Sequence, residues 1–182
     1  MGQNDELVRD LEARFRNLSL LLYDTDVDPA VVDAEVAPLL DRNVRFTDPW
    51  QQASGRDKYR IGAAGFHAMF RFKLEIRQVG VQLADDGAGG RAMVDGVMHL
   101  RPLGRLINYP LRTILVYDFV LSDTAKLRIL AHEEMWSIAD MIAAMPVTGM
   151  LYRHVFRPVF SRGFLAASWF TARARGMLPS LK

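Results

Sequence analysis

The spacing of apolar side chains in the first part of the chain is typical of helices. From Leu7 to Leu22, apolar residues recur at steps of three and four, which places them on one face of a helix. Asp28 followed by Pro29 indicates the start of a second helix, because Asp accepts hydrogen bonds from free amides and Pro suits the first turn. The pair Ser54 and Asp57 resembles a capping box and predicts a third helix.

Beyond Phe72 the period changes to two, which is typical of strands that bury one face. The expected strands are residues 73–84, 91–100, 112–121 and 127–136. Inside the first of them the apolar positions change parity near Arg77, which predicts a β-bulge or a sharp bend. Short polar loops connect these strands as hairpins. We therefore expect an α+β fold in which one curved antiparallel sheet wraps around the N-terminal helices.

The composition narrows the class of protein. Of the 182 residues, 50% are hydrophobic and 10% aromatic, which is enough for a sizeable core. Cysteine is absent, which excludes disulfides, thiolate catalysis and cysteine-bound zinc and fits a reducing compartment, so we expect a cytoplasmic protein. The four histidines lack metal-ligand spacing and no cofactor motif is visible, so we expect neither a metal nor a cofactor.

The charges are unevenly distributed. Residues 1–140 hold 17 Lys/Arg and 21 Asp/Glu, whereas residues 141–182 hold 6 Lys/Arg and no acidic residue. The basic tail also carries many aromatic side chains, so it can dock on its own acidic domain or lie on an anionic membrane surface through residues 146–182. We expect the first arrangement, because exposed Phe and Trp side chains forgo the free energy of burial. No nucleic-acid-binding motif accompanies the charge, so no nucleic-acid partner is expected.

Two stretches resemble the nuclear transport factor 2-like superfamily, especially its SnoaL-like branch. FTDPWQQASGRDKY, which begins at Phe46, resembles that group's passage from a strand through an Asp-Pro loop into a helix. LRILAHEEMWSIADMI, which begins at Leu127, resembles its last strand and the start of the next helix. The resemblance implies a cone-shaped roll at residues 5–142, followed by a helical extension at 143–182. This fold hosts isomerases, cyclases, hydrolases and binding modules, so it does not select one activity.

The last hairpin carries the candidate catalytic residues. If Leu121 faces Leu127, the even positions of both strands share one face, and that face carries Arg112, Asp118, Arg128, His132, Glu134 and Trp136. In a ligand cavity, Glu134 or His132 would act as general base with Asp118 as its partner. The alternative is a solvent-exposed face with cross-strand ion pairs.

Four further residues are candidates for ligand contact: Trp136, Tyr59, Trp50 and Asp48. Asp48 either serves as an acid at the mouth of the cone or caps a turn, which is the commoner role of an Asp before Pro. Our first functional hypothesis is a module that binds a small apolar molecule or a protein partner, including a second copy of the chain. The second is a cofactor-independent isomerase, cyclase or hydrolase that uses the carboxylate and histidine pair. The third is a peripheral membrane or scaffold protein that acts through the tail.

Overall fold

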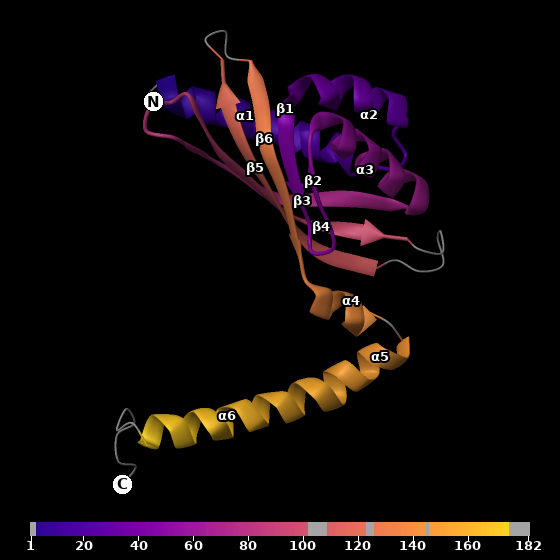
Figure 1. Ribbon diagram of the computed structural model, residues 1–182, viewed down its shortest axis with the longest axis vertical. Coiled ribbons are helices and arrows are strands. Elements are labelled where there is room, and N and C mark those ends of the chain that lie inside the picture. The colour runs from indigo at the N-terminus through magenta and orange to yellow at the C-terminus, as the bar shows by residue number, and fades with distance from the viewer. Residues whose placement is uncertain (1–2, 102–108, 123–125, 145, 175–182) are drawn as a thin grey trace. The chain divides into compact units, whose positions relative to one another are not determined.

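The computed structural model describes residues 3–101, 109–122, 126–144 and 146–174 (Figure 1). The chain divides into two compact units, Met1–Ser137 and Ile138–Lys182. The boundary expected at 142 falls within helix α4 (Ile138–Ala144), which belongs to the second unit.

Three helices and one short 3-10 turn precede the long strands of the first unit. They are α1 (Gln3–Leu22), α2 (Pro29–Val36), η1 (Ala37–Leu39) and α3 (Arg56–Met69). Asp28 caps α2 as expected, because its Oδ1 accepts a 2.8 Å hydrogen bond from the Ala30 amide. The expected cap of α3 by Ser54 is wrong: Ser54 ends strand β2 (Gln52–Ser54), and Gly55, with φ of 103°, precedes the helix. That positive φ favours glycine over any residue with a side chain.

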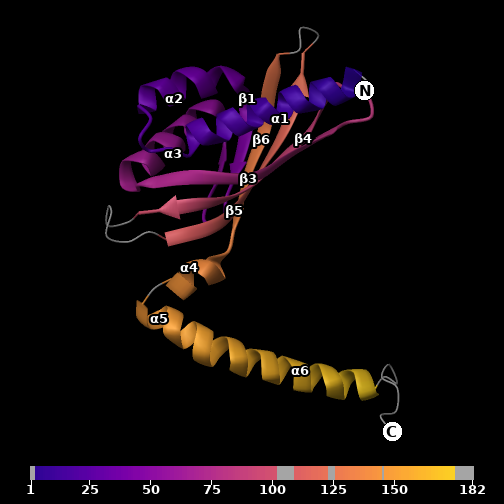
Figure 2. The ribbon, with the colours of Figure 1, turned by 180° about the vertical axis from the view of Figure 1, so that it is seen from behind.

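The four expected long strands are confirmed, and two further strands join them. The sheet contains β1 (Leu40–Thr47), β2, β3 (Phe72–Leu83), β4 (Gly89–Leu100), β5 (Tyr109–Leu121) and β6 (Leu127–Trp136), in the order β2-β1-β6-β5-β4-β3. Strands β3 to β6 pair antiparallel as expected, but β1 pairs parallel with β6, so the sheet is mixed. Figures 1 and 2 show its strong curvature, with α1 lying across the inner face.

The bend in β3 lies where the sequence places it. Ile76 pairs with Gly96 and Gln78 with Asp95, so Arg77 is an extra residue in β3 and forms the predicted bulge. Gly96 lies directly opposite this bend, where a Cβ atom would come within 2.6 Å of the Glu75 carbonyl oxygen. The close approach of the two strands therefore requires glycine at this position.

Helix α1 supplies the centre of the core. Its Phe15 side chain is fully buried and its ring lies 5.3 Å from Tyr117 and 5.1 Å from Phe119, both on β5. Ser19, one helical turn further along α1, is also buried, and its Oγ lies 3.0 Å from the Tyr117 hydroxyl. The helix thus contributes both apolar and polar contacts to the inner face of the sheet.

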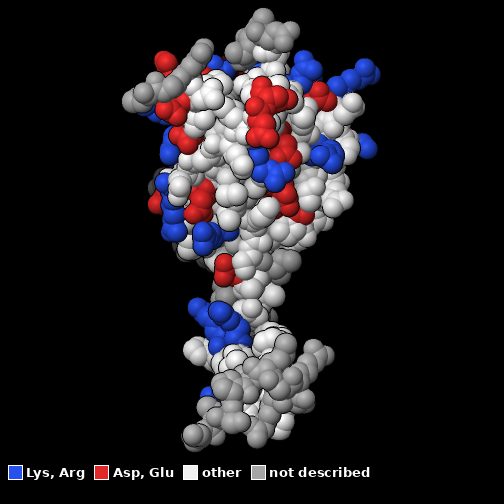
Figure 3. Space-filling view, turned by 90° about the vertical axis from the view of Figure 1, so that its left-hand side faces the viewer, with Lys and Arg blue, Asp and Glu red and all other residues white. Residues whose placement is uncertain are grey.

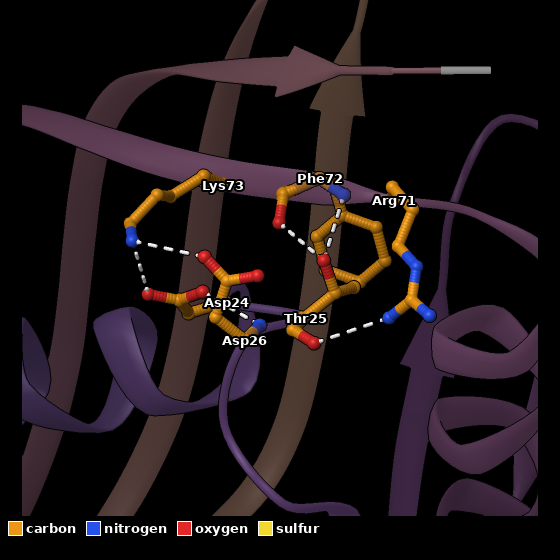
Figure 4. Close-up of polar contacts among 6 residues, drawn as sticks. All are labelled: Asp24, Thr25, Asp26, Arg71, Phe72 and Lys73. Atoms are coloured by element: carbon orange, nitrogen blue, oxygen red, sulfur yellow. Dashed lines mark hydrogen bonds and ion pairs between the residues drawn. The ribbon is translucent and has the colours of Figure 1, made fainter. Parts of the chain in front are cut away.

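The chain after α1 is fastened to the start of β3 (Figure 4). Thr25 Oγ1 donates to the Phe72 carbonyl at 3.0 Å and accepts from the Phe72 amide at 3.1 Å. Lys73 Nζ lies 3.0 Å from Asp24 and 3.5 Å from Asp26. Because the Leu74 amide also donates to the Tyr23 carbonyl at 2.9 Å, these contacts fix the backbone that carries the Tyr23 side chain.

The second unit is helical. It contains α4, α5 (Pro146–Leu151), a π-helical turn η2 (Tyr152–Phe156) and α6 (Arg157–Ala174). The rings of Tyr152, Phe156, Phe160 and Phe164 stack along one side, with successive centroid distances of 5.6, 5.9 and 6.3 Å. None of the described helices has both the length and the apolar character that a membrane span requires. Docking of this unit on its own domain, or on a membrane surface, stays a prediction.

Candidate functional site

A second bulge, in β6, decides which side chains point into the cone. Phe119 pairs with Ile129 and Asp118 pairs with Ala131, so Leu130 is an extra residue in β6. Residues directly opposite one another in an antiparallel pair share a face. Beyond the bulge, His132 therefore shares the buried face with its partner Tyr117, which is completely buried.

Glu134 follows His132 on this inner face and meets Tyr23 from the end of α1. The Tyr23 hydroxyl donates a hydrogen bond to Glu134 Oε1. Burial raises the pKa of Glu134 to about 7, while the hydrogen bond from Tyr23 lowers it and the nearby Asp48 charge raises it further. Glu134 can therefore exist both as carboxylate and as carboxylic acid near neutral pH, as a general acid–base requires.

His132 lies beside this carboxyl group and is held by two phenols. Its Nδ1 lies 2.8 Å from the Tyr59 hydroxyl and its Nε2 lies 3.3 Å from the Tyr23 hydroxyl. The Tyr117 ring stacks on the imidazole at a centroid distance of 4.4 Å. Burial lowers the pKa of His132 to about 3, so the imidazole is neutral at physiological pH. Burial raises the pKa of both Tyr23 and Tyr59 well above the usual value, so both phenols stay protonated.

Glu134 lines a cavity of about 60 Å³ between the sheet and α3. Tyr23 and Phe46 contribute to its wall, and α3 contributes Lys58, Tyr59, Gly62, Ala63, Phe66 and His67. Asp48 lines the same cavity and also caps a turn, because its Oδ1 accepts from the amides of Trp50 at 2.6 Å and Gln51 at 2.7 Å. The two roles considered for Asp48 from the sequence are therefore compatible.

A larger groove of about 490 Å³ lies between α2 and α3. Its lining is mainly apolar and includes Val32, Val36, Leu40, Ile61 and Ala64. Tyr59, Ala63 and His67 line both this groove and the smaller cavity, so α3 forms the wall between them. At the exposed rim, Arg60 pairs with both carboxylate oxygens of Asp33 at 2.6 and 2.5 Å, which joins α3 to α2.

Asp118 does not belong to this site, and the expectation that it shares a face with Glu134 is wrong. The extra residue Leu130 shifts the pairing by one, so Asp118 lies opposite Ala131 on the outer face. Its carboxylate there accepts hydrogen bonds from Arg91 at 2.7 and 3.2 Å.

Arg112, also expected on the same face as Glu134, pairs instead with Asp95 at 3.3 Å on the outer face. Arg128 is exposed and lies 3.7 Å from Asp41. Figure 3 shows acidic and basic side chains next to one another on one side of the first unit. Cross-strand ion pairs, the alternative considered from the sequence, thus describe the outer face, whereas Glu134 and His132 lie inside.

Two of the three tryptophans, Trp50 and Trp136, form a pair near Glu134. The rings of Trp50 and Trp136 meet edge-on with a centroid distance of 4.5 Å, and Trp50 is 58% exposed. A hydrogen bond from the Trp136 side chain also lowers the pKa of Glu134. Neither tryptophan is among the residues that line the cavity, so their expected contact with a ligand stays a prediction.

Tyr23, Ser19 and Tyr117, which complete the polar lining of the core, were not among the site residues predicted from the sequence. The signal was present, because Phe15, Ser19 and Tyr23 follow one another at intervals of four and so share a helix face. Within the described part of the chain, no cluster of three or more His, Asp or Glu side chains is arranged to hold a metal ion.

Comparisons with known proteins bear on the fold. No protein-family model matches the chain, and its sequence matches no curated protein. Nuclear transport factor 2 from Cryptosporidium parvum is similar in structure, with a TM-score of 0.56 and 17% identity over 71% of this chain and 94% of that one.

Two further structures resemble the chain to a similar degree. A protein from Novosphingobium aromaticivorans, provisionally assigned as a scytalone dehydratase, gives a TM-score of 0.57 and 15% identity over 71% of this chain and 83% of that one. A protein of unknown function from Mycobacterium tuberculosis gives a TM-score of 0.59 and 14% identity over 75% of this chain and 77% of that one. The resemblance found in the sequence is confirmed for the fold: the chain has the α+β cone fold of the nuclear transport factor 2-like superfamily.

Proposed function

We propose that the chain is a cofactor-independent enzyme that moves a proton on a small apolar substrate, as isomerases and cyclases do. The observation that carries this proposal is the half-buried Glu134 carboxyl group, which is held by the Tyr23 hydroxyl and whose pKa is raised to about 7 by removal from solvent. A base whose pKa lies near the working pH combines a useful ionised fraction with a useful driving force for proton transfer.

The chemistry assigns one role to each of these groups. The ionised carboxylate of Glu134 takes a proton from an acidic carbon of the substrate, and the electron pair of the broken C–H bond moves onto an adjacent carbonyl. The protonated Glu134 then returns the proton to another carbon or oxygen, so the enzyme is regenerated without a cofactor. Tyr23 fixes one carboxylate oxygen throughout, which limits the orientations that the base can adopt.

The size of the cavity limits what can react there. A volume of about 60 Å³ is well below the roughly 300–1,000 Å³ of ordinary ligand pockets. Only the reacting end of a substrate fits beside Glu134 unless the walls move. Exposed Gln51 and Lys58 form part of the lining, so the remainder of the substrate extends past them towards solvent.

Proton transfer can be tested without knowledge of the natural substrate. Opening of 5-nitrobenzisoxazole, a small apolar carbon acid, reports a general base by the colour of its phenolate product. A panel of small cyclic ketones in D₂O reports the same chemistry by deuterium uptake. We expect rates that rise with pH around a midpoint near 7 and fall at least about a hundredfold in Glu134→Gln.

Asp118→Asn is the matched control, because Asp118 is a carboxylate on the neighbouring strand that faces outward and pairs with Arg91. It should leave the rates unchanged. Equal rates in wild type and Glu134→Gln, or no reaction above buffer with any of these probes, would contradict the proposal.

A second candidate function, binding of a neutral apolar molecule without turnover, is favoured by the α2–α3 groove. Its volume of about 490 Å³ lies within the range of ligand pockets, and its lining is mainly apolar. Fluorescence of N-phenyl-1-naphthylamine, a neutral apolar probe, measures such binding. We expect Ala64→Leu, which fills the groove, to weaken binding, and Ala68→Leu, exposed on the same helix but outside the groove, to leave it unchanged. Equal affinities of the two variants would contradict binding of the probe in the α2–α3 groove.

A further inference from the structure

Four side chains from three parts of the first unit form a continuous line of polar contacts: Tyr59 on α3, Tyr23 at the end of α1, and His132 and Glu134 on β6. Tyr59 on α3 lies 2.8 Å from His132 Nδ1, and His132 Nε2 lies 3.3 Å from the Tyr23 hydroxyl. Tyr23 in turn donates to Glu134. Tyr59 also lines the α2–α3 groove, so the line runs from that groove to the reacting carboxyl group.

We propose that Tyr59, His132 and Tyr23 form a relay that carries a proton between the α2–α3 groove and Glu134, and that each passage exchanges the two tautomers of His132. The proposal rests on the role of Glu134 proposed above. The hydrogen bonds that form the relay do not depend on the identity of the substrate.

The direction of each hydrogen bond follows from the charge of Glu134. An ionised carboxylate only accepts, so the Tyr23 O–H must point towards it. The Tyr23 oxygen can then only accept from His132, which requires the proton on Nε2. A neutral imidazole has one N–H, so Nδ1 is left to accept the O–H of Tyr59. In this state every donor along the line points towards Glu134.

Protonation of Glu134 reverses the direction of every hydrogen bond along the line. A proton that reaches the Tyr59 oxygen from the groove lets the Tyr59 hydroxyl proton move to His132 Nδ1. The Nε2 proton of His132 then moves to the Tyr23 oxygen, and the hydroxyl proton of Tyr23 moves to Glu134. Each group between the groove and Glu134 gains one proton and loses one, so only Glu134 changes charge. The imidazole has exchanged its Nε2–H form for its Nδ1–H form.

The surroundings of His132 suit such a relay. Burial lowers the pKa of its imidazole to about 3, so the relay does not stop at a stable imidazolium. The Tyr117 ring stacks on the imidazole and holds its plane, but the Tyr117 hydroxyl contacts Ser19 and takes no part in the line. Among the described residues, the other ionisable groups around Glu134 are Asp48, Lys58 and His67 of the cavity wall and Tyr117 of β5.

Nitrogen-15 NMR of the full chain with labelled histidine distinguishes the two tautomers directly. The chain has four histidines, and the signal of His132 is identified as the one that is lost in His132→Gln. In wild type we expect the Nε2–H form of His132 above pH 7 and the Nδ1–H form below it, with the midpoint at the titration of Glu134, near pH 7. The exchange should vanish in Glu134→Gln and persist in the control Tyr117→Phe.

A constant His132 tautomer between pH 5 and 9 in wild type, or a pH-dependent exchange that persists in Glu134→Gln, would overturn the relay. Because this titration needs no substrate, its outcome is independent of whether the probe reactions succeed. Failure of those reactions alone removes the proposed function and leaves the coupling of His132 to Glu134 standing.

The route through Tyr59 needs a second measurement. With a cyclic ketone deuterated at its acidic carbon, label is lost only when Glu134 exchanges its captured deuteron with water before returning it. We expect label loss in H₂O to fall at least about tenfold in Tyr59→Phe, while Tyr117→Phe retains the wild-type rate. Unchanged label loss in Tyr59→Phe would overturn the passage through Tyr59.

Discussion

The Tyr23 hydroxyl donates a hydrogen bond to the carboxylate of Glu134, although the two residues lie 111 positions apart in the chain. The contact joins the end of α1 to the end of β6. It opposes the effect of burial on Glu134, because a donor to the ionised form lowers the pKa whereas burial raises it. The balance between these two effects sets the pH at which the proposed base is active.

Removal of the Tyr23 hydroxyl should therefore shift the titration of Glu134 upward. In Tyr23→Phe we expect the pKa of Glu134 to rise by about 1 unit or more, since a hydrogen bond to a charged group contributes roughly 1.5–3 kcal/mol. Carbon-13 NMR of labelled glutamate measures this pKa without a substrate. Tyr117→Phe removes a neighbouring buried phenol that bonds to Ser19, so it should cause a smaller change. A pKa that falls or stays constant in Tyr23→Phe would contradict the role assigned to this hydroxyl.

Burial of Glu134 should also cost stability at alkaline pH. Its folded pKa of about 7 lies above the ordinary value of 4.5, so the penalty is absent below pH 4.5, grows as pH rises and is complete above pH 7. Glu134→Gln lacks this penalty. We expect its free energy of unfolding, relative to wild type, to increase by about 3 kcal/mol from pH 4.5 to pH 8. Urea unfolding at several pH values measures the difference, and a difference that is independent of pH would show that the carboxyl group is hydrated in the folded state.

His132 should have the opposite effect in the same pH range. Its folded pKa of about 3 lies below the ordinary value of 6.5, so its contribution to stability is present above pH 6.5 and is lost as the pH falls. Relative to His132→Gln, wild type should lose about 2 kcal/mol between pH 7 and pH 5 in urea unfolding. A constant difference across this range would mean that His132 becomes charged in the folded protein as readily as in water.

The bend of β3 should depend on Gly96. A Cβ atom there would lie 2.6 Å from the Glu75 carbonyl oxygen, so Gly96→Ala must push the two strands apart. We expect a loss of about 1–3 kcal/mol in chemical unfolding. Gly80→Ala is the matched control, because it adds the same methyl group to β3 where no atom lies within 4 Å. Equal stabilities of the two variants would show that the sheet relaxes without cost at Gly96.

The attachment of residues 24–26, after α1, to the start of β3 should contribute to stability more through Thr25 than through the ion pairs of Lys73. Thr25→Val keeps the shape of the side chain but removes the two hydrogen bonds that the Thr25 hydroxyl makes with the backbone of Phe72, so we expect a loss of about 1–2 kcal/mol. Lys73→Met removes exposed ion pairs with Asp24 and Asp26 and should cost less than about 1 kcal/mol. A larger loss in Lys73→Met than in Thr25→Val would reverse this ranking.

The helices, the long strands and the bulge at Arg77 could be predicted because each leaves a local periodic pattern in the sequence. The parallel pairing of β1 with β6 could not, since nothing in residues 40–47 records which strand will lie beside them. Gly55 precedes α3 in place of Ser54 because pairing with Arg45 draws Ser54 into β2.

The candidate site was predicted in part. Glu134 and His132 stood out as polar residues at even positions of the last strand. Asp118 was placed with them wrongly because Ile129, Leu130 and Ala131 are all apolar, which hides the change of parity. Tyr23, the common partner of Glu134 and His132 at the end of α1, could not be predicted from the hairpin, since it lies more than a hundred positions away in the chain.

The extra residue Leu130 changes which positions of β6 face the core, from odd numbers before it to even numbers after it. Before it, Leu127 and Ile129 point into the core, and after it, His132 and Glu134 do. Loss of Leu130 would leave Ile129 opposite Phe119 and Ala131 opposite Asp118, so Glu134 would stay on the inner face. Loss of Glu133 would instead place Glu134 directly after His132 and turn it to the surface. The position of the proposed base therefore depends on the spacing between His132 and Glu134, so deletion of Glu133 should abolish activity, whereas deletion of Leu130 should retain part of it.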